Sequence, residues 1–284
     1  MLYTVIFRIL KPSIISNSPD STIYKIFKLI INIIIFFKKK SKGKFQVYKI
    51  DRRIGVLKFY KYDFIAFKLE DLINLEELIM IKYYLINKKN YKNFLDFGAN
   101  IGLHTIIAKK LGYNVKSFEP DKKHFLELKR NCQLNNVRKI NLYQKAVFNK
   151  KCIITFVKVK NNTTANHILG RKQNLYGPIE KQIVYAVKAN TLFKGNDLVK
   201  IDVEGAEFDI IKSIKLKSWN NIDCFVSIHN KKIAKQIYNF FIKKKINLFS
   251  SKKNWKKVLK FSDMPQKHPE GLLFISSKKN MNWN

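Results

Sequence analysis

The stretch NFLDFGANIG, residues 93–102, decides the fold of this chain. Five residues typical of a strand run into a turn containing Gly98 and Gly102, and a segment with helical apolar spacing begins at Leu103. A strand, a glycine turn and a helix in this order build the ligand loop of an α/β sheet, because glycine lets a ligand approach the backbone. We therefore expect an α/β domain that binds its ligand at this turn.

The rest of the chain from about residue 91 alternates apolar strands with helical stretches, which predicts a mostly parallel sheet with crossover helices. The expected strands are residues 93–97, 114–118, 140–143, 198–201, 223–228 and 271–276, and the expected helices are 103–111, 121–134, 204–217 and 233–244. Residues 150–190 contain two β-like pieces around a polar loop at 160–178. We interpret that loop as a lid or a substrate-facing insertion.

The turn after the first strand favours a cationic cofactor over a dinucleotide. A dinucleotide fingerprint needs G-x-G-x-x-G, but Asn100 and Leu103 occupy the second and third glycine positions. A carboxylate at Asp96 would repel a pyrophosphate and attract an amine. S-adenosyl-L-methionine carries an ammonium and a sulfonium and no phosphate, so it is the cofactor that the pattern predicts.

A second acid, Glu119, follows the second strand 23 residues after Asp96. A carboxylate at that point can accept hydrogen bonds from two ribose hydroxyls, so it fits adenosine recognition. The third acidic segment is KIDVEGAEFD, residues 200–209, where four of the chain's 20 acids fall within 202–209. Asp202 would end the fourth strand and point into the crevice where open α/β sheets bind ligands.

The other acids of this segment divide into two groups. Glu204 lies close enough to Asp202 in sequence for us to expect it in the site, whereas Glu207 and Asp209 also fit the first turn of a helix, where acids favour the helix dipole.

Five segments together resemble the FkbM family of S-adenosylmethionine-dependent methyltransferases. They are DFGANIG (96–102), FEPDKKHF (118–125), the pair Asn131 and Asn135, KAVFN (145–149) and VKIDVEGAE (199–207). The resemblance covers about residues 91–230. It implies a class I methyltransferase fold, a seven-stranded mostly parallel sheet with the last strand antiparallel, and methyl transfer to a hydroxyl of a sugar, glycan, polyketide or other small metabolite. The cofactor residues expected on this basis are Asp96, Gly98, Asn100, Gly102, Glu119, Pro120 and Ala146.

Transfer to a hydroxyl requires removal of one proton, for which a general base must lie within hydrogen-bond reach. His229, at the end of the fifth strand, and Asp202 are the candidates, with Glu204 as a third catalytic residue. The family often has a Glu before the His, whereas Ile228 stands here, so no carboxylate base is expected at that position. A divalent ion held by Asp202, His229 and Asn230 is a minor alternative, and no metal is predicted from the spacing.

The charge does not by itself identify a partner. The 284 residues contain 56 Lys and Arg against 20 Asp and Glu, a formal net charge of +36. Only six of the 56 are Arg, although nucleic-acid readers favour the bidentate fork of that residue. A nucleic-acid partner is therefore not expected. Two alternatives stay open, an RNA ribose 2′-O-methyltransferase that uses Lys200 and Asp202, and a non-catalytic binding module.

Residues 1–90 form an N-terminal appendage that precedes a methyltransferase domain at 91–284. Residues 1–21 are turn-prone without the pattern of a signal peptide, 45–69 predict a β-hairpin or a small antiparallel meander, and 70–87 predict a helix. Three scattered cysteines favour a reducing compartment, so we expect a cytoplasmic enzyme. The oligomeric state is not predicted.

Residues 22–37 predict an apolar helix too short and too polar to span a membrane, followed by lysines at positions 38–44. Its polar residues, Lys25, Lys28 and Asn32, form one narrow stripe. The remaining apolar face either packs on the protein or lies in anionic lipid headgroups, which would place residues 22–44 on the inner face of a membrane.

Overall fold

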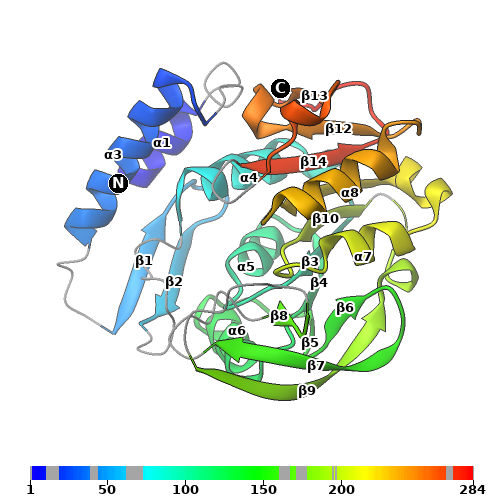
Figure 1. The fold of residues 1–284 in the computed structure, drawn as a ribbon. Coiled ribbons are helices and arrows are strands. Elements are labelled where there is room, and N and C mark those ends of the chain that lie inside the picture. Colours follow the sequence, from blue (N-terminus) through cyan, green and yellow to red (C-terminus); the bar gives the residue numbers. More distant parts are fainter. Residues whose placement is uncertain are drawn as a thin grey trace.

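The computed structural model describes residues 2–10, 19–38, 44–61, 73–159, 167–170, 178–193, 195, 197–266 and 271–283. Its centre is an eight-stranded sheet in the order β13-β12-β14-β11-β10-β3-β4-β5 (Figure 1). The strands are β3 Asn93–Phe97, β4 Asn114–Phe118, β5 Asn141–Tyr143, β10 Asp197–Ile201, β11 Ile222–Ser227, β12 Asn247–Ser250, β13 Lys256–Lys257 and β14 Leu272–Ser276.

The strand directions confirm the predicted class I methyltransferase fold. Strands β5, β4, β3, β10 and β11 pair in parallel, and β14 runs antiparallel between β11 and β12. The short β13 extends the seven expected strands by one edge strand of two residues.

Helices cover both faces of this sheet because alternate side chains of a strand point to opposite sides. Phe94 and Leu198 belong to the hydrophobic cluster that holds residues of α4 Leu75–Ile86, α5 Leu103–Lys110 and α6 Lys122–Leu134. Their neighbours Leu95 and Val199 belong to the cluster with residues of α7 Glu207–Ser213 and α8 Lys231–Phe241. The central strands are therefore buried on both faces, as is typical of a parallel sheet with crossover helices.

The helix predicted at 204–217 is wrong in its bounds. The structure has α7 only over Glu207–Ser213, followed by the 3-10 segment η5 Leu216–Asn221. Glu204 and Gly205 have φ values of 54° and 114°, in the left-handed region, so the residues after β10 form a loop instead of a first helical turn. The remaining 3-10 segments are η2 Lys88–Asn90, η4 Ala189–Thr191, η6 Ser251–Lys253 and η7 Phe261–Asp263.

A second, four-stranded sheet lies beside the main one, in the order β6-β9-β7-β8. It consists of β6 Ala146–Phe148, β7 Cys152–Val159, β8 His167–Ile168 and β9 Ile179–Lys188. Its apolar side packs on Ala206 and Val203, so this sheet supports the loop that follows Asp202. Residues 160–166 and 171–177 of the expected lid lie outside the described residues.

The N-terminal part contains α1 Leu2–Ile9, α3 Thr22–Lys38 and an antiparallel hairpin of β1 Phe45–Lys49 and β2 Val56–Tyr60. Within the turn-prone residues 1–21 the structure has the helix α1, in which Tyr3, Ile6 and Phe7 recur at the spacing of a buried helical face. The predicted hairpin is present over 45–60, and residues 62–72 lie outside the description. Within the described residues, every helix is too short or too polar to cross a bilayer.

The appendage shares the core of the sheet. Phe7, Leu57 and Leu78 belong to the same hydrophobic cluster as Phe94 and Phe274. Residues on both sides of the boundary expected at residue 90 are therefore packed together, and the boundary itself stays a prediction.

Candidate active site

The carboxyl ends of four neighbouring strands bring the predicted site residues together. Asp96 pairs in register with Lys200, and the residues just beyond β4, β10 and β11 include Glu119, Asp202 and His229. Backbone hydrogen bonds join the loops, since Asp202 donates its N–H to the Phe97 carbonyl at 3.0 Å and Gly98 donates to the Phe118 carbonyl at 3.0 Å. Segments far apart in sequence thus meet at the edge where α/β sheets bind ligands.

Asp96 and Lys200 form a buried ion pair at the carboxyl ends of these strands. The Asp96 carboxylate is fully buried and accepts a hydrogen bond from the Thr105 hydroxyl at 2.7 Å. The Lys200 ammonium lies 3.7 Å from Asp96 and 3.6 Å from Asp202, and it donates to the Gly98 carbonyl at 3.2 Å. Burial lowers the pKa of Lys200, but the two carboxylates outweigh burial and raise that pKa, so the ammonium stays charged between them.

The two glycines of the turn are required by packing. A Cβ on Gly98 would lie 1.9 Å from the Asp202 backbone oxygen, and one on Gly102 would lie 2.5 Å from the Leu128 side chain. Both residues also have positive φ, 79° and 99°. The turn therefore packs against protein atoms at both glycines, and the expected contact of these residues with the cofactor stays a prediction.

A hydrogen bond between Asn100 and Glu119 joins the loop after β3 to the residue that follows β4. The buried Glu119 carboxylate accepts the N–H of Asn100 at 2.8 Å and that of Asp121 at 2.9 Å. Burial raises the pKa of Glu119 to about 8, against these two N–H groups, which lower it. Pro120 follows Glu119 directly, whereas Ala146 begins β6 and packs in the cluster of the second sheet with Ala206.

Two buried acceptors at this edge lack a donor among the described residues. They are one carboxylate oxygen of Asp96, Oδ1, and the amide oxygen of Asn100. Buried acceptors are normally hydrogen-bonded, so a pair of unsatisfied ones beside a cluster of carboxylates fits a ligand that brings donors and positive charge. S-adenosylmethionine has an ammonium, ribose hydroxyls and an adenine amine, and the residues present therefore fit it.

His229 lies among three carboxylates. Its Nε2 is 3.2 Å from Asp202 Oδ1 and 3.4 Å from Glu207 Oε1, and its Nδ1 is 3.6 Å from Glu204 Oε2. Burial lowers the pKa of His229, but the carboxylates outweigh it and raise the pKa to about 10. Burial raises the pKa of Asp202, and Lys200 and His229 reverse this and hold it well below its usual range. At neutral pH the pair is therefore an imidazolium and a carboxylate, so His229 must lose a proton before it can act as a base.

Glu207 holds the loop that carries Glu204. Its fully buried carboxylate accepts the N–H of Val203 at 3.2 Å and the N–H of Gly205 at 3.0 and 3.1 Å. Glu207 also offers, with Asp202 and His229, three potential metal-ligand atoms within 4.8 Å of one another. A divalent ion would therefore find three ligands here, although the backbone already occupies much of the Glu207 carboxylate.

The helix α4 contributes residues that the sequence did not indicate. Two of them, Glu77 and Tyr84, contact His104 of α5. The His104 ring lies 2.6 Å from the Glu77 carboxylate and 3.1 Å from the Tyr84 hydroxyl, and it is buried. Burial raises the pKa of Glu76 to about 7, the neighbouring Glu77 adds to this, and Asp202 is a further cause. Tyr24 of α3 donates a hydrogen bond to Glu76. The start of α4 is therefore close enough to the cluster to act on its charge.

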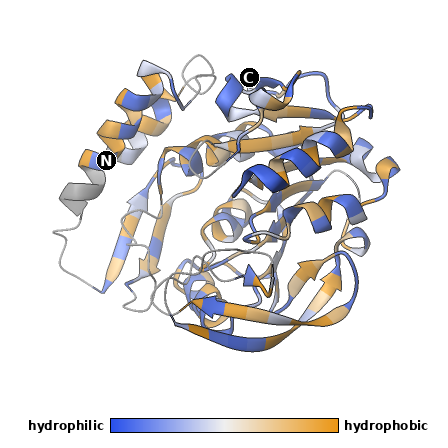
Figure 2. Cartoon of the chain, in the orientation of Figure 1, coloured by the Kyte–Doolittle hydropathy of each residue, from blue (hydrophilic) through white to orange (hydrophobic). Residues whose placement is uncertain are grey.

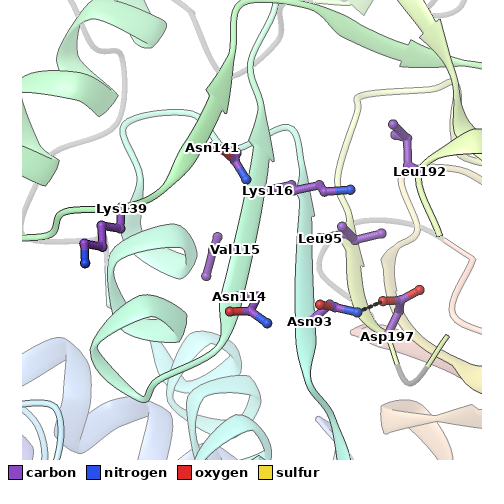
Figure 3. A pocket seen from close by; sticks show the side chains of 9 residues that line it. All are labelled: Asn93, Leu95, Asn114, Val115, Lys116, Lys139, Asn141, Leu192 and Asp197. Carbon is purple, nitrogen blue, oxygen red and sulfur yellow. Dashed lines mark hydrogen bonds between the residues drawn. The ribbon is translucent and has the colours of Figure 1, made fainter. Parts of the chain in front are cut away.

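A separate cavity of about 250 Å³ lies near the amino ends of β3, β4 and β10, away from the predicted site (Figure 3). It is lined by Asn93, Leu95, Asn114, Val115, Lys116, Lys139, Asn141, Leu192 and Asp197. Asn93, Asn114 and Asp197 are the first residues of their strands, and Asn93 donates to Asp197 at 2.8 Å. Because ligands of α/β sheets bind at the carboxyl ends of the strands, this cavity is not the predicted cofactor site.

The raised pKa of Glu119 predicts a pH dependence of stability. In the folded protein the Glu119 carboxyl group keeps its proton up to about pH 8, whereas in the unfolded chain it loses that proton near its usual pKa of about 4.5. The contribution of Glu119 to the free energy of unfolding is therefore fully present below about pH 4.5 and is lost as the pH rises to about 8. We expect the Tm of the wild type, relative to Glu119→Gln, to fall by several degrees between pH 5 and pH 9. Net charge affects both proteins alike, so a constant or rising difference would contradict the assignment.

Comparison with known proteins gives a consistent match. Residues 96–259 match the family described as the methyltransferase FkbM domain. The protein named Methyltransferase 1 of Beauveria bassiana is 27% identical over 183 residues, which cover 56% of this chain and 73% of that protein.

Solved structures with similar folds are more distant. A SAM-dependent methyltransferase from Agrobacterium tumefaciens has a TM-score of 0.41 and 10% identity, with 84% of this chain and 72% of that chain covered. A precorrin-6y C5,15-methyltransferase from Geobacter metallireducens has a TM-score of 0.41 and 10% identity, with 76% and 91% covered.

Proposed function

Because the chain belongs to the FkbM family of methyltransferases, we propose that it transfers a methyl group from S-adenosylmethionine to a hydroxyl of a sugar, glycan or small metabolite. The observation that carries the hydroxyl assignment is the position of His229 beside Asp202 at the ends of the strands, 3.2 Å apart. A hydroxyl has a proton that must leave, and the neutral form of His229, held by Asp202, can receive it.

When bound, S-adenosylmethionine supplies a methyl group already activated on a sulfonium. The residues that would hold it are Asp96, Asn100 and Glu119, which lie at or just after the carboxyl ends of β3 and β4. Asp96 Oδ1 and the Asn100 amide oxygen accept no hydrogen bond from the described residues, and the Glu119 carboxyl group has lone pairs left that can accept ribose hydroxyls. Gly98, Gly102 and Pro120 would then act through the shape of the loops that follow these strands, and Ala146 would act from the start of β6.

Asp96→Asn tests the cofactor side. The substitution preserves the shape of the side chain and removes the negative charge, so we expect the dissociation constant for S-adenosylhomocysteine to rise by about tenfold or more. Isothermal titration measures it. Asp51→Asn removes the same charge from the turn between β1 and β2 and serves as the control. An unchanged affinity in a folded Asp96→Asn protein would remove Asp96 from the cofactor site.

On the acceptor side, the neutral form of His229 keeps its proton on Nε2, which faces Asp202 at 3.2 Å, and takes the hydroxyl proton through Nδ1. Asp202 and Glu207 lie beside Nε2 and Glu204 lies beside Nδ1, so the imidazolium that forms is stabilised from both ends of the ring. Asp202 orients the ring, and the loop held by Glu207 places Glu204. The same carboxylates that make His229 a strong base keep it protonated at neutral pH, so we expect the reaction to speed up in alkaline buffer.

One alternative acceptor is weakened by the geometry. In a ribose 2′-O-methyltransferase Lys200 would have to contact the substrate, but its ammonium is enclosed by Asp96, Asp202 and the Gly98 carbonyl. Lys200 is only 6% exposed. We therefore favour a sugar or small-metabolite hydroxyl over RNA. The cytoplasmic location expected from the cysteines stays a prediction.

The acceptor class is tested by supplying methyl-labelled S-adenosylmethionine with nucleotide sugars, lipid-linked glycans and RNA side by side. We expect the label in an alkali-stable methyl ether on a sugar. Label in RNA alone would support the ribose methyltransferase instead. Absence of transfer to every acceptor, by a protein that binds S-adenosylhomocysteine, would favour the non-catalytic binding module.

A further inference from the structure

The helix α3 carries two apolar stripes, and the structure buries only one of them. Tyr24, Phe27 and Ile31 recur at i, i+3 and i+7 and face the protein, with Tyr24 and Ile31 buried. Ile26, Leu29, Ile30 and Ile33 recur at i, i+3, i+4 and i+7 on the other side of the helix, and they are 51%, 61%, 38% and 47% exposed. These four residues are called the outer face of α3.

An apolar outer face is unusual for a surface helix. In a water-soluble protein the side of a helix that points away from the core is normally polar. Here four aliphatic side chains adjoin one another there, and Val5 and Ile9 of α1 are also 49% and 44% exposed. Figure 1 shows α1 and α3 at the rim of the molecule, away from the central sheet, and Figure 2 shows hydrophobic segments along both. A contiguous exposed patch of this kind is typical of a binding surface.

Positive charge borders this patch. Lys25 and Lys28 are exposed, and with Asn32 they form the polar stripe between the buried side and the outer face. Residues 1–50 contain ten basic residues and a single acid, Asp20. An apolar helix face flanked by lysines is the pattern of a helix that lies in the headgroup layer of an anionic bilayer, with its apolar side chains at the acyl boundary.

We propose that the outer face of α3 docks this protein on an anionic membrane surface. A second copy of the chain is the less suitable occupant, because joining two such faces would bring Lys25, Lys28 and the rest of the basic N-terminal segment against their own copies. Anionic lipid instead complements that charge while it covers the aliphatic side chains. With 17 residues, α3 lies along the bilayer surface and does not cross it. This docking does not depend on which hydroxyl the enzyme methylates.

Vesicle co-sedimentation of the full chain tests the proposal. We expect the wild type to bind vesicles of phosphatidylcholine with phosphatidylglycerol at least about tenfold more tightly than vesicles of phosphatidylcholine alone. Leu29→Glu with Ile33→Glu should weaken the binding to anionic vesicles by about tenfold or more, because charged residues cannot enter the acyl boundary. Both positions are exposed, so the fold should be retained.

The matched control is Ile153→Glu with Ile183→Glu on the second sheet, where the side chains are 63% and 72% exposed. This pair changes the net charge by the same amount, so it separates insertion of α3 from general attraction of a basic protein. Equal binding by both double variants would overturn the proposal, and so would a wild type that ignores anionic vesicles. A wild-type dimer in sedimentation that disappears only in Leu29→Glu with Ile33→Glu would identify a second copy as the occupant and also overturn it.

Discussion

His229→Ala should lower the turnover number for methyl transfer by a factor of about 100 to 10,000, the usual worth of a positioned general base. Binding of S-adenosylhomocysteine should be largely retained, because the cofactor residues Asp96, Asn100 and Glu119 lie in or after other strands, β3 and β4. The wild-type rate should rise about tenfold per pH unit as the imidazolium of His229 is titrated, since its pKa lies near 10 in the free protein. The variant should lose this dependence, which a merely structural histidine would not affect.

His167→Ala is the matched control, because His167 is another buried histidine but lies on β8 of the second sheet. A His229→Ala enzyme with near wild-type turnover and saturable cofactor binding would remove the base assignment. The assay is repeated with a chelator, because Asp202, Glu207 and His229 can also group around a divalent ion. Activity that disappears with the chelator and returns with Mg²⁺ would assign these residues to a metal instead.

Gly98→Ala should cause the largest loss of stability. The added Cβ would lie 1.9 Å from the Asp202 backbone oxygen, which belongs to a loop fixed by the sheet and cannot move aside cheaply. The positive φ of 79° adds about 1 to 2 kcal/mol for a residue with a side chain, and steric overlap adds about 1 to 3 kcal/mol. We expect a loss of about 3 kcal/mol or more, which corresponds to a fall in Tm of about 6 to 12 °C.

Gly55→Ala separates the two causes. Gly55 has a similar φ of 74°, but a Cβ there would meet no atom within 4 Å. Its substitution should therefore cost only the backbone term, about 1 to 2 kcal/mol. Thermal unfolding of both variants measures the difference. A Gly98→Ala protein as stable as Gly55→Ala would show that the turn does not pack against the loop after Asp202.

The strand ends of the site could be predicted because they follow from local sequence. Strands β3, β4 and β10 are short segments with apolar residues at most of their buried positions, and an acid lies at or just beyond the carboxyl end of each. Once the strands are parallel, their carboxyl ends must meet, so Asp96, Glu119 and Asp202 could be placed at one edge before any contact was known. Their approximate grouping required no knowledge of side-chain conformation.

Other parts of the site depend on packing between distant segments. The ion pairs of Lys200 with Asp96 and Asp202 require the register of β10 against β3. The approach of Glu76 to the site requires the docking of α4 on the sheet, more than 100 residues away in sequence from Asp202. Sequence patterns with a period of a few residues cannot report such contacts. The sequence did contain one indication of the ion pairs, Lys200 within the strand sequence DLVKI, because a lysine in a buried strand needs an acidic partner.

The central claim is that Asp96, Asn100 and Glu119, at the carboxyl ends of β3 and β4, hold S-adenosylmethionine. Isothermal titration of the wild-type protein with S-adenosylhomocysteine tests it most directly. The account predicts saturable binding in a one-to-one complex. A folded protein that shows no binding at millimolar S-adenosylhomocysteine would contradict the account.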